Sequence, residues 1–227
     1  WIDKETSDSV CIHSFYNARS ALYHGLLVLW VVQGDGVVVQ WYTCVSVINA
    51  IKAVGAIPVF VDITKDSLNI DTNELVNVLE SEQWRVKAVI VQHTLGIVAD
   101  MDALQKICQQ YDVALLEDCA HALWASYKDR KVGRLGDVAI FSFGRDKIVS
   151  SVNGGVLLVN NESYFSYLGW IKTVDVSSLL VFKNLLYAVV WYFCYITYDV
   201  LKIGKLIYYM AGKMWWFPVI VSEREKE

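Results

Sequence analysis

Lys147 stands between two apolar runs of the chain, DVAIFSF before it and GGVLLVN after it. Ser142 precedes it by five residues, and Asp118 and His121 lie earlier, in the segment LLEDCAHA. A lysine amine held away from water can form a Schiff base with an aldehyde. A carboxylate at the end of an apolar run is costly to bury unless a cation pairs with it, so Asp118 suits a cationic group on a ligand.

Two further groups complete the pattern. A serine hydroxyl and the backbone amides of a helix N-terminus can hold a phosphate, and an aromatic ring such as that of Tyr42 can stack on a flat cofactor. An aldehyde, a protonatable ring nitrogen, a phosphate and a flat ring occur together in pyridoxal phosphate, an electron sink that the protein orients. The residues therefore indicate a pyridoxal phosphate site.

Each of these residues also has a simpler interpretation on its own. Asp118 could cap a following helix, His121 could be a satisfied structural histidine, and Ser142 could be a turn residue. Tyr42 could belong to the core, and Lys147 could point to solvent. The prediction depends on the set and not on any one member.

The elements that must position this set alternate between strands and helices. Apolar runs typical of buried strands are GVVVQW, IPVFVDI, VKAVIVQHT, VALLEDCA, DVAIFSF and GGVLLVN. Helical patterns cover residues 17–32, TCVSVINAIKAVGA, the segment that starts at Asp71 with Glu74 in a capping-box-like position, and residues 100–111. This order predicts an α/β fold, with a mostly parallel sheet and helices on both faces.

Several chemically unusual residues follow the ends of the predicted strands. Tyr42, His93, Asp118 and Ser142 each end or directly follow one of them. Because ligands of such sheets bind outside the carboxyl ends of the strands, we expect these four residues at one edge.

The composition excludes several classes of protein. The chain of 227 residues has a net charge of -4 and no basic run, so we expect no nucleic-acid partner. Its five cysteines form no CxxC pair and its four histidines are dispersed, which predicts a reducing compartment and no metal site. The opening segment WIDKETSDSV lacks the apolar core of a signal peptide, so we expect a cytoplasmic protein.

The chain resembles the DegT-type nucleotide-sugar aminotransferases, which belong to fold type I of the pyridoxal phosphate enzymes, in the aspartate aminotransferase superfamily. The resemblance lies in YNARSALYHGL, YTCVSVINAIKAVGAIPVFVDI, IVQHTLGIVADMDAL, LLEDCAHA, GRLGDVAIFSFGRDK and GGVLLVNN, in this order. These segments cover about residues 16–161, and a serine and a lysine at this spacing after EDCAHA are specific. The resemblance implies the large cofactor domain, with a sheet of the seven-stranded type.

The resemblance also implies a role for each site residue. Lys147 matches the lysine that binds the cofactor aldehyde and transfers a proton, and Asp118 matches the acid that pairs with the ring nitrogen. His121 matches a position beside the ring oxygen. Ser142 matches a phosphate ligand, and Tyr42 matches the aromatic residue that stacks on the ring.

One match departs from the family pattern. Ala18 and Arg19 match a Gly-Thr pair that binds the phosphate, but Arg19 has no hydroxyl, although its guanidinium could reach a phosphate. The resemblance implies amino transfer from glutamate to a keto-sugar nucleotide in polysaccharide or amino-sugar biosynthesis, by a homodimer. Dehydratases of the family have histidine at the position of Lys147. A non-catalytic, regulatory or truncated inactive member is the alternative.

The chain divides into three segments by composition. We expect the large cofactor domain over residues 1–178, partial at its N-terminus, an apolar helical tail over 179–220, and the start of a linker to a missing small C-terminal domain over 221–227. The apolar run 185–198 has 14 residues, fewer than the about 20 that span a bilayer. Trp, Tyr and Lys gather within 184–220, which favours peripheral contact with the inner face of the membrane. A buried helical hairpin or a dimer surface is the other interpretation.

Overall fold

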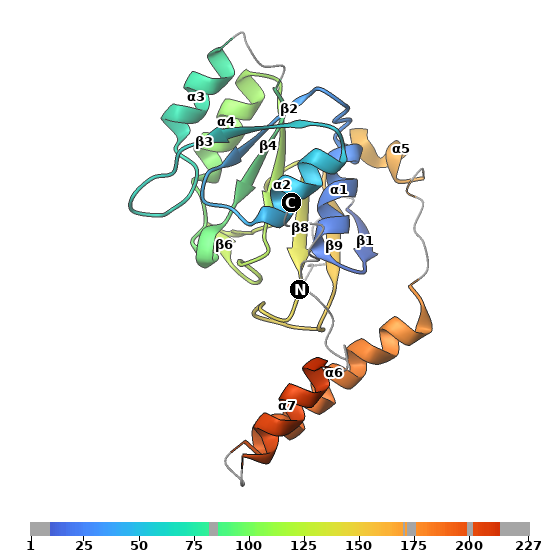
Figure 1. The fold of residues 1–227 in the computed structure, drawn as a ribbon. Helices are drawn as coiled ribbons and strands as arrows, with labels where there is room; N and C mark the ends of the chain where they lie inside the picture. Colours follow the sequence, from blue (N-terminus) through green and yellow to red (C-terminus); the bar gives the residue numbers. More distant parts are fainter. Residues whose placement is uncertain (1–9, 82–85, 170, 172–175, 199–201, 214–227) are drawn as a thin grey trace. The chain divides into compact units, whose positions relative to one another are not determined.

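The computed structural model describes residues 10–81, 86–169, 171, 176–198 and 202–213 (Figure 1). Contacts divide the chain into two units, Trp1–Ile171 and Lys172–Glu227. The predicted linker at 221–227 lies outside the described residues. Each unit is described here by itself.

The first unit is built on a seven-stranded sheet with the strand order β1-β9-β8-β5-β4-β2-β3. The parallel pairs are β2 with β3, β2 with β4, β4 with β5 and β5 with β8, and β9 runs antiparallel to both β8 and β1. The predicted mostly parallel α/β sheet is confirmed. Its strands are β1 (Cys11–Phe15), β2 (Gly36–Gln40), β3 (Ile57–Val61), β4 (Val86–Gln92), β5 (Ala114–Asp118), β8 (Val138–Ser142) and β9 (Gly155–Val159). A separate two-stranded hairpin is formed by β6 (Ser126–Tyr127) and β7 (Arg130–Lys131).

Helices cover both faces of the sheet, as the sequence predicts (Figure 1). Successive residues of β2 alternate between the two faces, because side chains along a strand point to opposite sides. Val37 and Val39 pack in one apolar cluster with α1 and α2, and Val38 packs in another cluster with α3 and α4. The helices of this unit are α1 (Ala18–Val28), α2 (Val45–Ala53), α3 (Thr72–Glu80), α4 (Met101–Gln110) and the short α5 (Phe165–Leu168), with 3-10 turns at Thr94–Gly96 and Glu162–Tyr164.

Polar side chains fix where these helices begin. The Asp71 carboxylate accepts hydrogen bonds from the backbone amides of Asn73 and Glu74, which confirms the predicted start of α3. The predicted helix over 17–32 is too long at its C-terminal end. α1 ends at Val28, because Trp30 adopts a left-handed backbone conformation with φ of 61° that a helix cannot continue through.

The second unit is a pair of packed helices, α6 (Ser178–Ile196) and α7 (Ile203–Lys213). The Ser177 hydroxyl caps α6 by accepting a hydrogen bond from the Leu180 amide. The described residues of the predicted apolar tail are therefore mostly helical, and the rest of it, residues 199–201 and 214–220, lies outside the described residues.

Candidate active site

The ends of β5 and β8 place Asp118 and Ser142 on the same face of the sheet. Leu116 and Ile140, two residues earlier in these strands, both pack in the cluster that contains α1. The alternation of side chains along a strand puts Asp118 and Ser142 on that face as well. Because β5 and β8 are parallel, both residues lie at the carboxyl edge of the sheet, where the sequence predicts the site.

Asp118 is a buried carboxylate, and the positive charges near it do not offset the effect of burial on its pKa. Its side chain is 5% exposed, and its Oδ1 accepts a hydrogen bond from the Ala120 amide at 3.0 Å. Burial raises the pKa of Asp118, although the Ala120 hydrogen bond and the charges of His121 and Lys147 act in the opposite direction. A further cation, such as a protonated ring nitrogen, would therefore stabilise the ionised carboxylate.

His121 offers a ring nitrogen that no described group satisfies. Its Nδ1 atom is buried and has no hydrogen-bond partner among the residues that the structure describes. Burial, followed by the charge of Lys147, lowers the pKa of His121, so the imidazole is neutral at neutral pH. Leaving a buried polar atom without a partner costs about 1–3 kcal/mol, which a ligand oxygen at this position would recover.

The side chain of Lys147 is largely shielded from solvent. It lies in a turn directly after β8, where its backbone amide donates to the Gly144 carbonyl at 3.1 Å. Its side chain is only 16% exposed, whereas that of its neighbour Asp146 is 63% exposed, and Nζ lies 3.2 Å from Asp146 Oδ2. The charge of Lys147 acts to lower the pKa of both Asp118 and His121, so the three residues lie near enough to interact electrostatically.

A close approach of backbones brings the N-terminus of α1 to Ser142. Gly155 is paired with Ser142 across β8 and β9. A Cβ atom on Gly155 would lie 2.5 Å from the Ala18 amide nitrogen and 2.5 Å from the Asn17 carbonyl. The start of α1, with the predicted phosphate-binding pair Ala18 and Arg19, therefore lies against the strand pair that carries Ser142. The amides of a first helical turn have no partner within the helix, so this place suits a phosphate.

Gly155 is a site residue that the sequence patterns did not identify. The signal was present in the Gly-Gly pair at 154–155, because a glycine at the start of a strand often marks the close approach of another backbone. Asn17 supports the same arrangement, since its side chain caps α1 by accepting from the Ser20 amide at 2.9 Å. This cap fixes the direction of the first turn.

Tyr42 lies in a loop that two buried glutamines hold in place. Gln40 Nε2 donates to the Tyr42 carbonyl at 2.9 Å, and the Thr43 hydroxyl donates to Gln92 Oε1 at 2.9 Å. The Tyr42 side chain is 51% exposed, so the interpretation of Tyr42 as a core residue is wrong. Its stacking on a cofactor stays a prediction.

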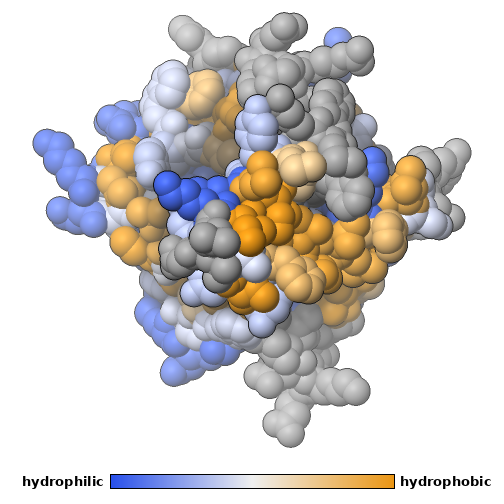
Figure 2. All heavy atoms as spheres, turned by 60° about the horizontal axis from the view of Figure 1, so that its bottom comes forward, coloured by the Kyte–Doolittle hydropathy of each residue, from blue (hydrophilic) through white to orange (hydrophobic). Residues whose placement is uncertain are grey.

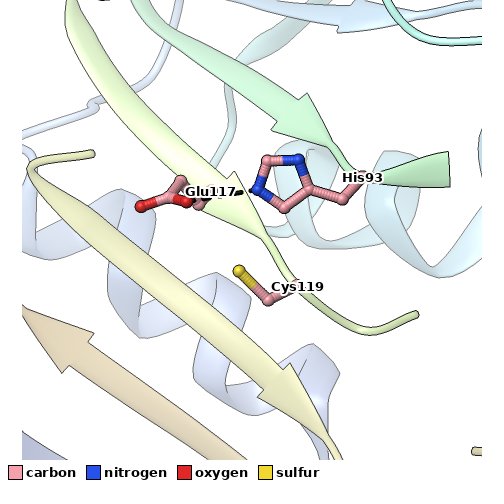
Figure 3. Close-up of side chains that lie close together, drawn as sticks. All are labelled: His93, Glu117 and Cys119. Carbon is pink, nitrogen blue, oxygen red and sulfur yellow. Dashed lines mark hydrogen bonds and ion pairs between the residues drawn. The ribbon is translucent and has the colours of Figure 1, made fainter. Parts of the chain in front are cut away.

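His93 also lies at the carboxyl edge, but in a different network (Figure 3). Val91 and Leu115, two residues before His93 and Glu117, pack in the cluster with α3 and α4, so the alternation of side chains puts His93 and Glu117 on the other face of the sheet. The Ala99 amide donates to His93 Nδ1 at 3.3 Å, so Nε2 carries the proton and donates to Glu117 Oε2 at 3.2 Å. The same carboxylate accepts from the amides of Gly133, Leu135 and Gly136 at 2.8, 2.7 and 2.6 Å. Glu117 thereby fixes the segment that leads into β8.

His93, Glu117 and Cys119 have ligand atoms within 4.8 Å of one another, a spacing that a metal site could use (Figure 3). The hydrogen bonds to Glu117 account for both of its oxygens. Burial, followed by the charge of Glu117, raises the pKa of Cys119 well above its usual value, whereas a metal ligand must be a thiolate. The chemistry of these donors therefore favours a structural network over a metal centre.

Comparisons with known proteins show the family of the chain. The model of the DegT/DnrJ/EryC1/StrS aminotransferase family matches residues 8–176. The GDP-perosamine synthase of Vibrio cholerae is 34% identical over 146 residues, which cover 64% of this chain and 39% of that protein. A putative L-glutamine:3-amino-2,3-dideoxy-scyllo-inosose aminotransferase of Micromonospora echinospora is 39% identical over 149 residues, which cover 66% of this chain and 35% of that protein.

A solved structure gives the same result. The PLP form of a putative sugar aminotransferase from Streptococcus pneumoniae matches with a TM-score of 0.64 and 28% identity, covering 70% of this chain and 44% of that chain. The present chain spans about two fifths of the length of the curated relatives it matches. The family match includes every site residue described above, and the chain therefore belongs to the DegT/DnrJ/EryC1/StrS family of sugar aminotransferases, with the PLP fold type I.

Proposed function

We propose that the protein is a pyridoxal phosphate-dependent aminotransferase that transfers an amino group from glutamate to a keto-sugar nucleotide. One observation carries the proposal: Asp118, His121 and Lys147 lie near enough for their charges to interact, burial leaves the carboxylate short of positive charge, and the imidazole Nδ1 has no partner among the described residues. These are the groups that a cationic, oxygen-bearing ring would satisfy.

The residues fit each part of the cofactor. Asp118 would pair with the protonated ring nitrogen, and His121 Nδ1 would form a hydrogen bond with the ring oxygen. Ser142 and the first turn of α1, from Ala18, would hold the phosphate, and Tyr42 would cover the ring. When bound, pyridoxal phosphate supplies an aldehyde and a ring that withdraws electrons from the substrate carbon.

Lys147 would carry out both the attachment and the proton transfer. Its Nζ would bind the aldehyde carbon and, once displaced by the amine of the donor, would move a proton at the substrate carbon as a general base and then a general acid. The low exposure of the side chain, 16%, keeps water from competing for that proton. Asp146, 3.2 Å from Nζ, would orient the amine between these steps.

The substrate and setting extend the proposal beyond the site. The names of the relatives in Vibrio cholerae and Micromonospora echinospora support a sugar or cyclitol carbonyl as the amino acceptor. We place the reaction in the cytoplasm, in surface-polysaccharide or amino-sugar biosynthesis, with a homodimer as the working form.

The amino-donor half of the reaction tests the proposal. Purified protein loaded with pyridoxal phosphate should release stoichiometric 2-oxoglutarate from glutamate, and a panel of keto-sugar nucleotides should then restore the original absorption for at least one member. Lys147→Ala should abolish 2-oxoglutarate release. Tight cofactor binding with no 2-oxoglutarate from the unaltered chain would overturn the proposal and support a non-catalytic member of the family.

A further inference from the structure

The α6–α7 hairpin has its small residues inside and its large apolar residues outside. Cys194 and Ala211 are among the few buried residues of these helices, with exposures of 6% and 7%. A Cβ atom on Gly204 would lie 2.1 Å from the Cys194 carbonyl oxygen, so the backbones of the two helices touch at this glycine. Close packing on small residues is typical of helices in a lipid environment.

Exposed apolar side chains cover more than one stripe of α6, although Asn184 and Cys194 are buried. Trp191, Tyr192 and Phe193 are consecutive, and they are 49, 58 and 52% exposed. Three consecutive positions of a helix point in directions about 100° apart, so a single protein groove could not cover them all. Only 11% of the most apolar 18-residue window of α6 is buried. The contacts within the hairpin itself therefore leave most of the described residues of α6 exposed.

Figure 2 shows the resulting surface, where hydrophobic side chains form a continuous area. On α7 the exposed residues continue the same character, with Leu206, Tyr208, Tyr209 and Met210 all more than half exposed. Apolar patches larger than a few hundred Å² are rare on soluble monomers. A surface of this kind requires a partner that surrounds both helices, which a lipid layer does.

The charges of the hairpin fit a negatively charged partner. Residues 178–213 contain four lysines, Lys183, Lys202, Lys205 and Lys213, and one acid, Asp199, for a net charge of +3 in a chain of net charge -4. Lys205 lies at the start of α7, and its Nζ is 4.8 Å from the centre of the Tyr198 ring. Tyrosine and lysine side chains of this kind are typical of the headgroup level of a bilayer.

The lengths of the helices favour the surface of a bilayer over a span. The uncharged apolar stretch 185–198 has 14 residues, or about 21 Å of helix, against a hydrocarbon thickness of about 30 Å. The described part of α7 has 11 residues, or about 16 Å. The whole of α6 has 19 residues and is long and apolar enough to cross a bilayer by length and composition alone. A crossing would place Lys183, the sixth residue of this helix, below the headgroup level, and the described part of α7 is too short to cross back.

We infer that the α6–α7 hairpin docks in the interfacial layer of an anionic lipid bilayer, with its apolar side chains among the acyl chains and its lysines at the phosphate headgroups. This inference does not depend on the proposed enzymatic function. It makes the chain a peripheral membrane protein, so its reaction would take place next to the lipid surface.

Flotation of the purified chain with lipid vesicles tests the inference. The protein should float with phosphatidylcholine vesicles that contain phosphatidylserine, and less with phosphatidylcholine alone. Each surface lysine adds about five-fold to partitioning on an anionic membrane, so Lys202→Gln with Lys205→Gln should lower binding about 25-fold on the anionic vesicles only. High salt should abolish this preference.

Phe193→Asp should lower the partitioning of the protein about ten-fold or more on both kinds of vesicle, because it replaces an aromatic ring that would insert among the acyl chains with a charged group. The matched control is Val32→Asp, which changes a 56%-exposed residue of the first unit and should leave flotation unchanged. Size-exclusion chromatography of each variant checks that the chain is folded. Protein that stays in the dense fraction with both kinds of vesicle would overturn the inference, and so would a soluble oligomer that Phe193→Asp dissociates.

Discussion

Replacement of Asp118 by asparagine separates a binding role from a structural one. The substitution keeps the size of the side chain and the Oδ1 acceptor for the Ala120 amide, but removes the charge. Burial raises the pKa of Asp118 in the folded chain above its unfolded value. The folded chain therefore binds the Asp118 proton more tightly than the unfolded chain does. The contribution of this proton to the free energy of unfolding is complete at acid pH, and it is lost as the pH rises through the pKa of Asp118 in the folded chain.

The effect of Asp118→Asn on the stability of the cofactor-free chain follows from this raised pKa. At neutral pH, Asp118→Asn should raise the free energy of unfolding, and the gain should disappear below the unfolded pKa of an aspartate. The cofactor-bound chain should respond in the opposite way. A charge-assisted hydrogen bond to the ring nitrogen is worth about 1.5–3 kcal/mol, so affinity for pyridoxal phosphate should fall roughly 10- to 150-fold.

Two measurements check this pair of effects. Visible absorption during titration with pyridoxal phosphate gives the affinity, and thermal unfolding of the cofactor-free protein at neutral and acid pH gives the stability. Asp129→Asn is the matched control, because Asp129 is an exposed residue in the turn between β6 and β7 and its substitution should have little effect on either measurement. If Asp118→Asn unfolds more easily at neutral pH and binds the cofactor normally, Asp118 is a structural residue and does not bind the ring nitrogen.

Two further substitutions probe the support of the site. Gly155→Ala puts a methyl group 2.5 Å from the Ala18 amide, which should cost about 1–3 kcal/mol of stability and weaken cofactor binding. The control Gly169→Ala, whose nearest neighbour would lie at 3.9 Å, should do neither. An unchanged melting temperature and affinity for Gly155→Ala would contradict the phosphate site proposed at the start of α1. Glu117→Gln places a side-chain amide opposite backbone donors in a fully buried network, and it should lower the free energy of unfolding in urea by about 3 kcal/mol or more. The affinity of the folded protein for the cofactor should not change, because Glu117 lies on the other face of the sheet. A loss of affinity without a loss of stability would show instead that Glu117 acts on the cofactor.

The parallel strands were predictable because their signal is strong and local. Runs such as 36–40 and 138–142 are apolar on both faces, as central strands between two helix layers must be. β1 was not indicated by the pattern, since Cys11–Phe15 is an edge strand with alternating exposure and polar residues within it. An edge strand is fixed by its partner, here β9, and not by its own composition.

The site was predictable in kind but not in its supporting contacts. Asp118 and Ser142 end apolar strands, so the edge of the sheet could be inferred for both. The approach of Gly155 to α1 joins residues more than a hundred positions apart, and no local pattern carries it. The prediction for His93 was correct for the edge of the sheet but did not include its face. The alternation of side chains along the strand directs His93 to Glu117 and away from Lys147.

The proposed function depends most directly on Lys147 as the residue that binds the cofactor. Incubation of the purified chain with pyridoxal phosphate, reduction with borohydride and peptide mass spectrometry would locate the covalent attachment. We expect one modified peptide, containing Lys147, and no specific modification or visible absorption band in Lys147→Ala. Modification of a different lysine, or an unchanged absorption band in the variant, would contradict this role of Lys147.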